Sequence, residues 1–286
     1  MTRLNAEEQK SVTHGEFWIP EEERKAYKLA LHTLNLAGVP YVVAGLYAIH
    51  HYTGIYRETK DLDLFVEPVR LIEAATVLKA AGFQVKLENP HWLAKALQDG
   101  HQVDLIFGMG NGLSFIDQDW YRYSRAAILA GEQVRVAPPE DLLWHRLFVS
   151  ERHRSDMSDA VHLIMCRGSE LDWARVLQRV GNQWRLLLAQ IHLFDFAYPG
   201  HRHKVPRPIR DLLLQRAHDE MDDVGDPNAC YGTLISRFSF AIDVNEWGMR
   251  DLRKEATALA RCLPIVQEII ASDVWDESTS EPERVD

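Results

Sequence analysis

The stretch that most constrains this chain is Arg57–Val66, which reads Arg-Glu-Thr-Lys-Asp-Leu-Asp-Leu-Phe-Val. Its last part alternates acidic and apolar residues, and this period of two predicts a strand with one buried face. Residues two apart on a strand point to the same side and are roughly 6.5 Å apart along it. Asp61 and Asp63 are therefore expected side by side on one face. Leu62 and Leu64, on the other face, are expected to enter the core.

Two neighbouring carboxylates on a strand are unfavourable, because they repel each other and because aspartate is depleted in strands. A hard cation removes this penalty, since Mg²⁺ binds one or two carboxylates together with substrate phosphates. Sites that transfer phosphoryl or nucleotidyl groups hold two such ions about 3.5–4 Å apart. To indicate this chemistry, the aspartate pair needs a third carboxylate and a turn that binds phosphate.

Asp104 is the candidate for the third carboxylate. The pair Asp99-Gly100 is a strong hairpin-turn signal, so a strand is expected over His101–Phe107. Asp104 shares one face of that strand with Gln102. If this strand lies beside the one that carries Asp61 and Asp63, the three aspartates converge.

Gly45 is the candidate for the phosphate-binding turn. It follows the apolar run Tyr41–Ala44, which reads as a buried strand, and precedes a helix expected over Leu46–Tyr52. Free backbone N–H groups at the start of a helix bind phosphate, and glycine allows a close approach. Arg57 and Lys60 flank the acidic strand and are further candidates for holding a triphosphate, the arginine through two parallel hydrogen bonds.

These residues together resemble the nucleotidyltransferase superfamily typified by DNA polymerase β. Gly45, the D-x-D sixteen residues later and Asp104 follow its pattern. The run Arg57–Asp63 is similar to the R-x-T/S-x-D-h-D form of minimal bacterial members, especially the branch related to abortive-infection toxins. The resemblance implies that Asp61, Asp63 and Asp104 bind two Mg²⁺ ions, with Mn²⁺ as an alternative, and that Asp104 activates the attacking hydroxyl. It implies an α+β fold with a small mixed sheet and flanking helices.

The implied reaction moves an NMP from an NTP, such as ATP, to an acceptor hydroxyl with release of pyrophosphate. The acceptor stays open between a tRNA or other RNA end, a protein hydroxyl and a small molecule such as an aminoglycoside. The toxin-like branch implies an antitoxin partner. Residues 154–159 are similar to that branch's R-x-K-D-x-x-D segment, with serine in place of lysine. Arg146, on a helix expected over Glu140–Glu151, is a candidate nucleotide contact.

Two alternatives stay open. In the superfamily the glycine is followed by a second glycine and a small residue, whereas this chain has Leu46 and Tyr47, which are expected to crowd the triphosphate. This departure favours a catalytically decayed protein that binds a nucleotide or a partner. A glycosyltransferase that uses D-x-D on a nucleotide sugar fits less well, because only sixty residues precede the motif.

The remaining chain divides by composition. Residues 1–18 are expected to be a flexible N-terminus, 19–137 the catalytic core, and 138–274, after Pro138-Pro139, a helical C-terminal domain. Residues 275–286 read as a disordered acidic tail. The final long helix is expected over Leu252–Ile270, interrupted by Pro264.

The formal net charge of −10 argues against a nonspecific nucleic-acid binder, whose surface is basic. A basic loop, His201–Arg207, leans slightly toward an acceptor that carries phosphate. The three cysteines are widely spaced and indicate neither a zinc site nor a disulfide framework. The N-terminal residues lack an apolar signal segment, and no apolar run approaches eighteen residues, so a cytoplasmic protein with no membrane partner is expected.

Overall fold

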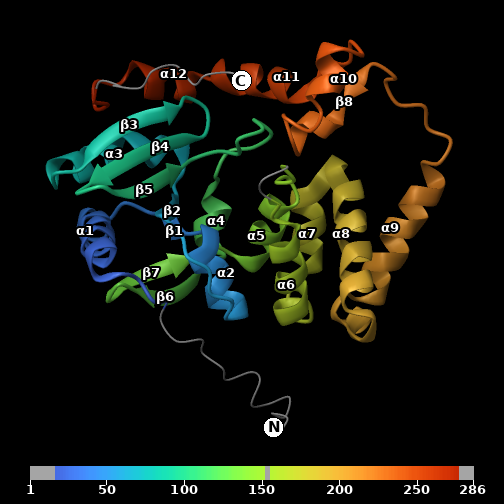
Figure 1. Cartoon of the computed structure of the whole chain (residues 1–286), viewed down its shortest axis with the longest axis horizontal. Coiled ribbons are helices and arrows are strands. Elements are labelled where there is room, and N and C mark those ends of the chain that lie inside the picture. The colour runs from blue at the N-terminus through green and yellow to red at the C-terminus, as the bar shows by residue number, and fades with distance from the viewer. Residues whose placement is uncertain (1–16, 152–154, 277–286) are drawn as a thin grey trace, which may run out of the picture.

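The computed structural model describes residues 17–151 and 155–276 of the 286-residue chain. Within them a seven-stranded mixed sheet has the spatial order β3-β4-β5-β2-β1-β7-β6 (Figure 1). The strands are β1 (Val42–Val43), β2 (Asp61–Phe65), β3 (Gln84–Asn89), β4 (Leu93–Gln98), β5 (His101–Ile106), β6 (Arg125–Leu129) and β7 (Glu132–Val136). β2 runs parallel to β5 and β1 parallel to β7, while the other neighbours are antiparallel. The predicted α+β fold with a mixed sheet is confirmed.

The strands that carry the acidic residues form where the alternating pattern predicted them. The turn between β4 and β5 is built as its sequence indicates, because Asp99 and Gly100 both have positive φ, at 51° and 84°. β4 itself was not predicted. Its sequence, Leu-Ala-Lys-Ala-Leu-Gln, is poor in the β-branched and aromatic residues that favour strands.

One face of the sheet is covered by α1 (Glu21–Ala37) and α3 (Pro68–Ala80). α1 follows Pro20 and ends before Gly38, which adopts a left-handed conformation. Leu62 and Leu64 are fully buried in the core that these helices form with the sheet. The alternation of β2 therefore turns its leucines to this core and its aspartates to the opposite face.

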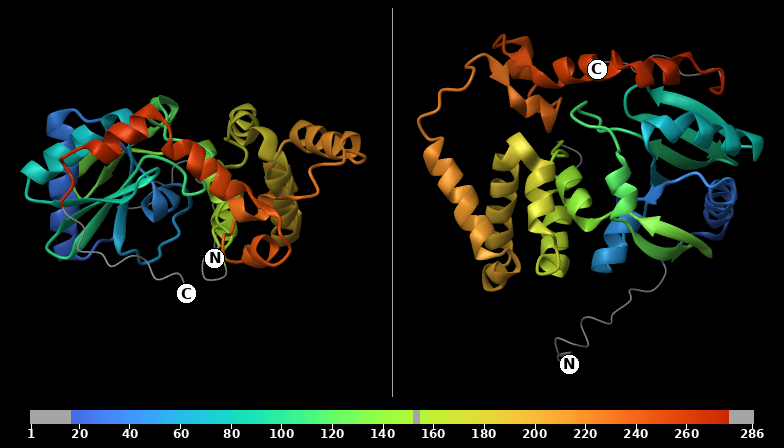
Figure 2. Two further views of the ribbon diagram at one scale, coloured as in Figure 1. Left: turned by 90° about the horizontal axis from the view of Figure 1, so that it is seen from above. Right: turned by 180° about the vertical axis from the view of Figure 1, so that it is seen from behind.

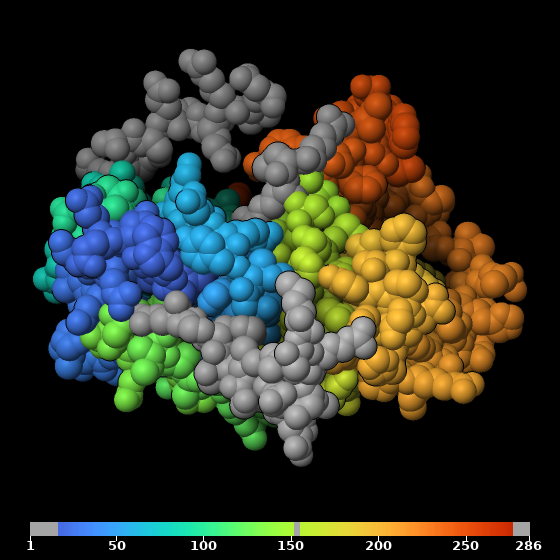
Figure 3. Space-filling model, turned by 60° about the horizontal axis from the view of Figure 1, so that its bottom comes forward, coloured from blue at the N-terminus to red at the C-terminus, as the bar shows by residue number. Residues whose placement is uncertain are grey.

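The opposite face meets helices that follow the sheet in sequence. Phe65, two residues after Asp63, belongs to a second core formed with these helices and with α2 (Gly45–Thr53). The helices are α4 (Gln118–Arg122), α5 (Pro139–Arg146), α6 (Met157–Arg167), α7 (Trp173–Val180), α8 (Trp184–Ala197) and α9 (Arg207–Asp219), with 3₁₀ turns at Gly181–Gln183 and Pro199–Lys204. α5 is shorter than the helix predicted over Glu140–Glu151. Figure 3 shows the surface of α2 adjoining that of α6, and Arg167 Nε donates to the Tyr52 carbonyl at 3.0 Å.

The C-terminal half of the chain is mostly helical, as predicted, and after α9 it also contains a short pair of strands. A short parallel pair, β8 (Ala229–Cys230) and β9 (Arg250–Asp251), encloses a 3₁₀ turn (Tyr231–Leu234) and α10 (Ala241–Asn245). This segment, for which the sequence offered no role, packs against the end of the α5 region, where Ser150 N donates to the Ile235 carbonyl at 3.0 Å.

The last helices return to the sheet (Figures 1 and 2). α11 (Leu252–Arg261) and α12 (Pro264–Ala271) are separated at Pro264, as predicted. Beyond α12, Lys79 Nζ donates to the Val274 carbonyl at 2.6 Å. Asp276 makes two hydrogen bonds with the backbone of Val85 on β3, each of 2.7 Å. Residues 264–276 thereby complete the core that begins with α1.

The division into a core and a C-terminal domain at residue 138 stays a prediction. One buried cluster contains residues from both sides of that position, from Val42 to Leu213. At the N-terminal end, Phe17 is buried against Tyr47, and residues 1–16 lie outside the described part of the chain. Trp275 and Asp276 are held by hydrogen bonds, and the rest of the predicted tail, residues 277–286, also lies outside it.

Among the described residues, no helix combines the length and the apolar character needed to cross a bilayer.

Candidate active site

The three aspartates meet on one face of the sheet, as the strand pattern predicted. β2 and β5 are neighbours, with Asp63 directly opposite Asp104 and Asp61 opposite Gln102. The nearest carboxylate oxygens of Asp61, Asp63 and Asp104 all lie within 4.8 Å of one another. Carboxylate oxygens gathered in this way are the ligands that Mg²⁺ and Mn²⁺ prefer. The donor set therefore fits a divalent metal ion.

Asp104 is the most buried of the three, with 8% of its surface exposed. Burial, together with the negative charges of Asp63 and Asp61, raises the pKa of its carboxyl group to about 7. Lys95 and a hydrogen bond from Gln102 act in the opposite direction. Three carboxylates this close are costly without a compensating charge, which is the condition that a bound cation relieves.

Two hydrogen bonds fix the orientation of the Asp61 and Asp104 carboxylates. Thr59 Oγ1 donates to Asp61 Oδ1 at 2.6 Å, and Gln102 Nε2 donates to Asp104 Oδ1 at 2.7 Å. Each donor precedes its aspartate by two residues, so each comes from the same strand or its immediate lead-in. Locked side chains of this kind keep metal ligands in place. Neither donor was among the predicted site residues, although the two-residue spacing was a signal for both.

Gly45 lies directly against the triad. Its φ is +56°, and a Cβ atom added there would be only 1.8 Å from Asp63 Oδ2. Glycine is therefore required for two independent reasons, the left-handed backbone and the contact with the carboxylate. α2 begins at this residue. The free N–H groups of the first turn of α2 consequently start beside the acidic cluster.

Tyr47 does not crowd the start of α2, contrary to the prediction. It is 5% exposed and packs in the core against Phe17, with ring centroids 4.4 Å apart, and against Tyr27. Burial is the main cause that raises the pKa of its hydroxyl group. Leu46 is partly exposed and is the one residue of the pair that remains at the surface of this turn.

The predicted arginines are joined to two aspartates at the start of α6. Arg57 Nη2 donates to Asp159 Oδ1 at 2.5 Å, and this carboxylate is nearly buried whereas the arginine is well exposed. Arg146 is 3% exposed and binds Asp156, with its Nε atom 3.9 Å from Asp159 Oδ2. Arg57 therefore remains accessible to a ligand, while Arg146 is enclosed in a buried ion network. Lys60 is exposed one residue before β2.

The comparison that decides the family is with protein-family models. Residues 31–196, more than half of the chain, match a model described as uncharacterised nucleotidyltransferase. The chain belongs to this nucleotidyltransferase family. The match includes the glycine turn, the acidic triad, Arg57 and the start of α6. The predicted superfamily and the predicted enzyme class are confirmed.

Solved structures of other nucleotidyltransferases are similar to this chain at low sequence identity. The lincosamide adenylyltransferase LnuA, bound to lincomycin, is 16% identical, with a TM-score of 0.36 over 51% of this chain and 96% of that one. The antibiotic-resistance factor ANT(2'')-Ia is 14% identical, with a TM-score of 0.39 over 71% of this chain and 100% of its own. A putative nucleotidyltransferase from H. pylori is 14% identical, with a TM-score of 0.34 over 88% of this chain and 96% of its own. No curated protein sequence matches significantly.

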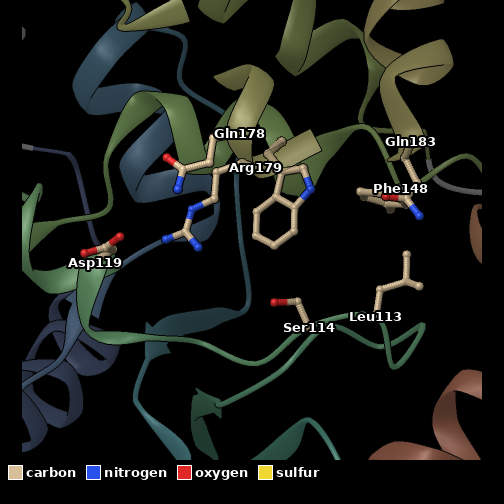
Figure 4. Close-up of a pocket in the computed structure, with 8 residues that line it drawn as sticks. Leu113, Ser114, Asp119, Phe148, Gln178, Arg179 and Gln183 are labelled. Carbon is tan, nitrogen blue, oxygen red and sulfur yellow. The ribbon is translucent and has the colours of Figure 1, made fainter. Parts of the chain in front are cut away.

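The nucleotidyltransferase also has a pocket of about 300 Å³ away from the triad. Figure 4 shows Gln178, Arg179 and Gln183 on one side of it and Leu113 and Ser114 on the other. Trp144, which also lines the pocket, contacts the buried Trp120, and Trp120 contacts Phe65 on β2. A buried aromatic cluster therefore lies between this pocket and the acidic triad.

The basic loop 201–207 lies far from the acidic cluster. An added Cβ at Gly168 would approach the Lys204 carbonyl within 2.7 Å, which places the loop at the C-terminal end of α6. Asp156 and Asp159, which bind the two arginines, lie at the other end of this helix. Because α6 has 11 residues, its two ends are roughly 16 Å apart. Nothing in this placement supports a role of the loop at the reacting hydroxyl.

Metal affinity of the nucleotidyltransferase is expected to increase with pH up to about 7 and then to level off. The Asp104 carboxyl group, with its pKa raised to about 7, is protonated below that pH and must lose its proton to bind an ion. Each pH unit below 7 should therefore weaken Mn²⁺ binding about tenfold. Titration of Mn²⁺ at pH 5.5, 6.5, 7.5 and 8.5, followed by electron paramagnetic resonance, measures this.

The same shift has a defined effect on the metal-free protein. Because the folded-state pKa of Asp104 is above its unfolded value, the stability that the protonated group contributes is complete below pH 4 and is lost as pH rises through 7. Bound Mg²⁺ should thus raise the melting temperature more at pH 8 than at pH 6. An equal rise at both values, or a flat Mn²⁺ titration, would contradict the assignment of Asp104 as a ligand.

Proposed function

We propose that this nucleotidyltransferase transfers an NMP from an NTP to an acceptor hydroxyl and releases pyrophosphate, in a Mg²⁺-dependent reaction in the cytoplasm. The observation that carries the proposal is the convergence of Asp61, Asp63 and Asp104 beside Gly45. A set of hard oxygen ligands next to a helix start supplies both requirements of nucleotidyl transfer, a place for cations and a place for phosphates.

Asp61 and Asp63 would hold the ions, with Mn²⁺ as an alternative to Mg²⁺, and Asp104 would share one of them. Bound ions supply neutralisation of the charge that develops on the phosphate oxygens and leaving group. The acceptor oxygen forms a bond to the α-phosphorus, and the bond from that phosphorus to the bridging α–β oxygen breaks. Asp104 accepts the hydroxyl proton as the general base.

Gly45 and Arg57 would position the phosphates. The first N–H groups of α2 donate toward the triphosphate, and the exposed guanidinium of Arg57 pairs with its oxygens while Asp159 holds the arginine in place. Lys60 would add charge at the mouth of the site. Arg146 would act indirectly, by orienting Asp159 through their buried network.

Arg57→Ala is expected to raise KM for the NTP about tenfold and to change kcat less. A charge-assisted hydrogen bond to phosphate is worth roughly 1.5–3 kcal/mol, and an exposed one lies at the lower end of this range. Arg70→Ala is the matched control, because Arg70 is on α3, on the other side of the sheet, where it forms an ion pair with Glu73. Steady-state kinetics with varied NTP concentration measure KM for both variants. An unchanged KM in Arg57→Ala would show that Arg57 does not bind the phosphates.

The test of the function uses the full chain, Mg²⁺ and each α-³²P-labelled NTP, with total RNA, cell lysate or no acceptor. Label on a macromolecule or small molecule that disappears with EDTA and with Asp104→Asn supports transfer and reveals the acceptor class. Label that persists in Asp104→Asn would contradict the role of Asp104. No label with any NTP, despite measurable nucleotide binding, would contradict the transfer reaction.

A binding-only protein with a decayed site is the second candidate. The partly exposed Leu46 at the start of α2 favours it, because a leucine side chain occupies the position next to the phosphate turn. Tyr47, the other residue expected to crowd the triphosphate, is buried and does not favour this candidate. Nucleotide binding without pyrophosphate release from any NTP would favour this candidate over transfer.

A toxin role with an antitoxin partner belongs to the same proposal and has a separate test. Expression in the native host should slow growth, and Asp61→Asn should relieve the effect. Normal growth on expression of the unaltered chain would exclude the toxin role without affecting the proposed reaction.

A further inference from the structure

A row of four side chains crosses the sheet and ends at the triad. Lys86 on β3 is directly opposite Lys95 on β4, Lys95 is opposite Asp104 on β5, and Asp104 is opposite Asp63 on β2. Directly opposite residues in a sheet lie on the same face, and neighbouring strands are about 4.8 Å apart. Lys95 is therefore about one strand from the proposed base, and Lys86 about two.

The part of the sheet that carries the two lysines is less covered on this face than on the other. Ala94 and Ala96, which point to the other face of β4, are fully buried under α3, whereas Lys95 between them is 24% exposed. Glu88 on the lysine face of β3 is exposed as well. Figure 1 shows β3, β4 and β5 with no described helix in front of them, and the rear view in Figure 2 shows α3 on the opposite side.

Two lysines directly opposite each other repel, which is unfavourable for a sheet unless an anion lies between or above them. In the structure, Lys95 Nζ is 3.5 Å from Glu88 Oε1, and that glutamate is 46% exposed. Lys86 interacts electrostatically with Asp276 near the sheet edge. An exposed pair such as Lys95–Glu88 is worth little, so an anionic ligand can replace the glutamate at small cost.

The order of the strands determines which substrate meets Lys95. Gly45 follows β1, which is on the far side of β2 from β5, so the phosphate turn and Asp104 lie on opposite sides of Asp63. In phosphoryl and nucleotidyl transfer the attacking and leaving oxygens are roughly in line, on opposite sides of the phosphorus. If pyrophosphate leaves toward Gly45, the acceptor enters from the side of Asp104 and Lys95.

On the basis of the proposed function, we propose that Lys95, supported by Lys86, binds a phosphate group of the acceptor next to the hydroxyl that reacts. The acceptor is thus an anionic phosphate ester: a monoester of a small molecule or a diester of a nucleic-acid strand. A polycationic acceptor such as an aminoglycoside would be repelled by the two ammonium groups at this position. Lys95 also lowers the pKa of Asp104 through its charge, which agrees with their closeness.

The test is isothermal titration of the full chain, saturated with Mg²⁺ and a non-hydrolysable NTP analogue. The probes are an RNA trinucleotide, cytidine 5′-monophosphate, cytidine and tobramycin. Lys95→Ala should weaken binding of the two phosphate-bearing probes at least about tenfold and leave that of cytidine unchanged. Lys95→Arg should retain most of the affinity. For the trinucleotide, Lys95→Ala should also reduce the slope of log Kd against log salt by about 0.7.

The control is Lys28→Ala, an exposed lysine of α1, the helix that covers the other face of the sheet, and it should bind every probe as the unaltered protein does. Tighter binding of the trinucleotide than of the monophosphate indicates a nucleic-acid acceptor, and equal binding indicates a small phosphate ester. Equal affinities for cytidine and its monophosphate, equal affinities in Lys95→Ala, or no binding of either phosphate-bearing probe would overturn the proposal. Failure of the NTP analogue to bind would instead overturn the proposed function.

Discussion

Asp61→Asn and Asp63→Asn are each expected to lower nucleotidyl transfer at least about a thousandfold. The amide removes a negative ligand from a site in which three carboxylate oxygens lie within 4.8 Å of one another. Neutralisation of the transferring group is worth several kcal/mol, and each 1.36 kcal/mol is a factor of ten in rate. The transfer rate with α-labelled NTP measures the loss of activity, and the Mn²⁺ affinity measures the loss of metal binding.

The fold should survive these substitutions. Asparagine has the shape of aspartate, and removing one of the charges beside Asp104 relieves repulsion, so the metal-free melting temperature should stay equal or rise. Asp99→Asn in the exposed β4–β5 turn is the matched control, since asparagine also tolerates its positive φ of 51°. Rates near that of the unaltered protein in both Asp61→Asn and Asp63→Asn would remove these residues from the active site.

Gly45→Ala is expected to lower nucleotidyl transfer at least about a hundredfold. A Cβ atom would lie 1.8 Å from Asp63 Oδ2, so either the carboxylate or the start of α2 must move. Misplacement of a catalytic group by about 1 Å can cost roughly a hundredfold in rate. The left-handed φ of +56° adds a backbone penalty of about 1 kcal/mol to folding.

Gly38→Ala separates the two effects. Gly38 has a similar φ of +68°, but an added Cβ would meet no atom within 4 Å. Both variants should therefore lose a similar part of the free energy of unfolding from the backbone, while only Gly45→Ala should lose metal binding and transfer. Urea denaturation and Mn²⁺ titration of both proteins provide the comparison. Full Mn²⁺ affinity in Gly45→Ala would mean that Asp63 is not a ligand.

The acidic strands and the glycine turn were predictable because their signals are local. Alternation over Asp61–Leu64 and the turn Asp99-Gly100 define the strands within a few residues. The convergence of the three aspartates was predicted only if β2 and β5 were neighbours. That pairing could not be predicted, since strand order depends on the whole sheet. β4 was not predicted, because its alanines and lysine have little strand preference. For the same reason the position of Lys95, directly opposite Asp104, was not predicted.

The arginine contacts were not predictable in detail. Arg57 and Asp159 are 102 residues apart, and no pattern in either segment indicates the partner. Arg146 was expected at the nucleotide because relatives of the toxin-like branch tend to have a lysine there, whereas the structure places it in a buried ion pair with Asp156. Likewise, the direction of the Tyr47 side chain was not predictable, because packing against Phe17 and Tyr27, which come from other segments, determines it.

The two hydrogen bonds between Asp276 and Val85 have a consequence for how the protein is made. Val85 belongs to β3, the outermost strand of the sheet, and its bonding partner is 191 residues later in the sequence. Until the ribosome has produced that partner, the N–H and C=O groups of Val85 on this edge strand are available to any other extended chain. Nascent chains on neighbouring ribosomes should therefore be able to associate through β3 until Asp276 has docked. Products of premature termination, which lack Asp276, should keep this edge open and depend on chaperones.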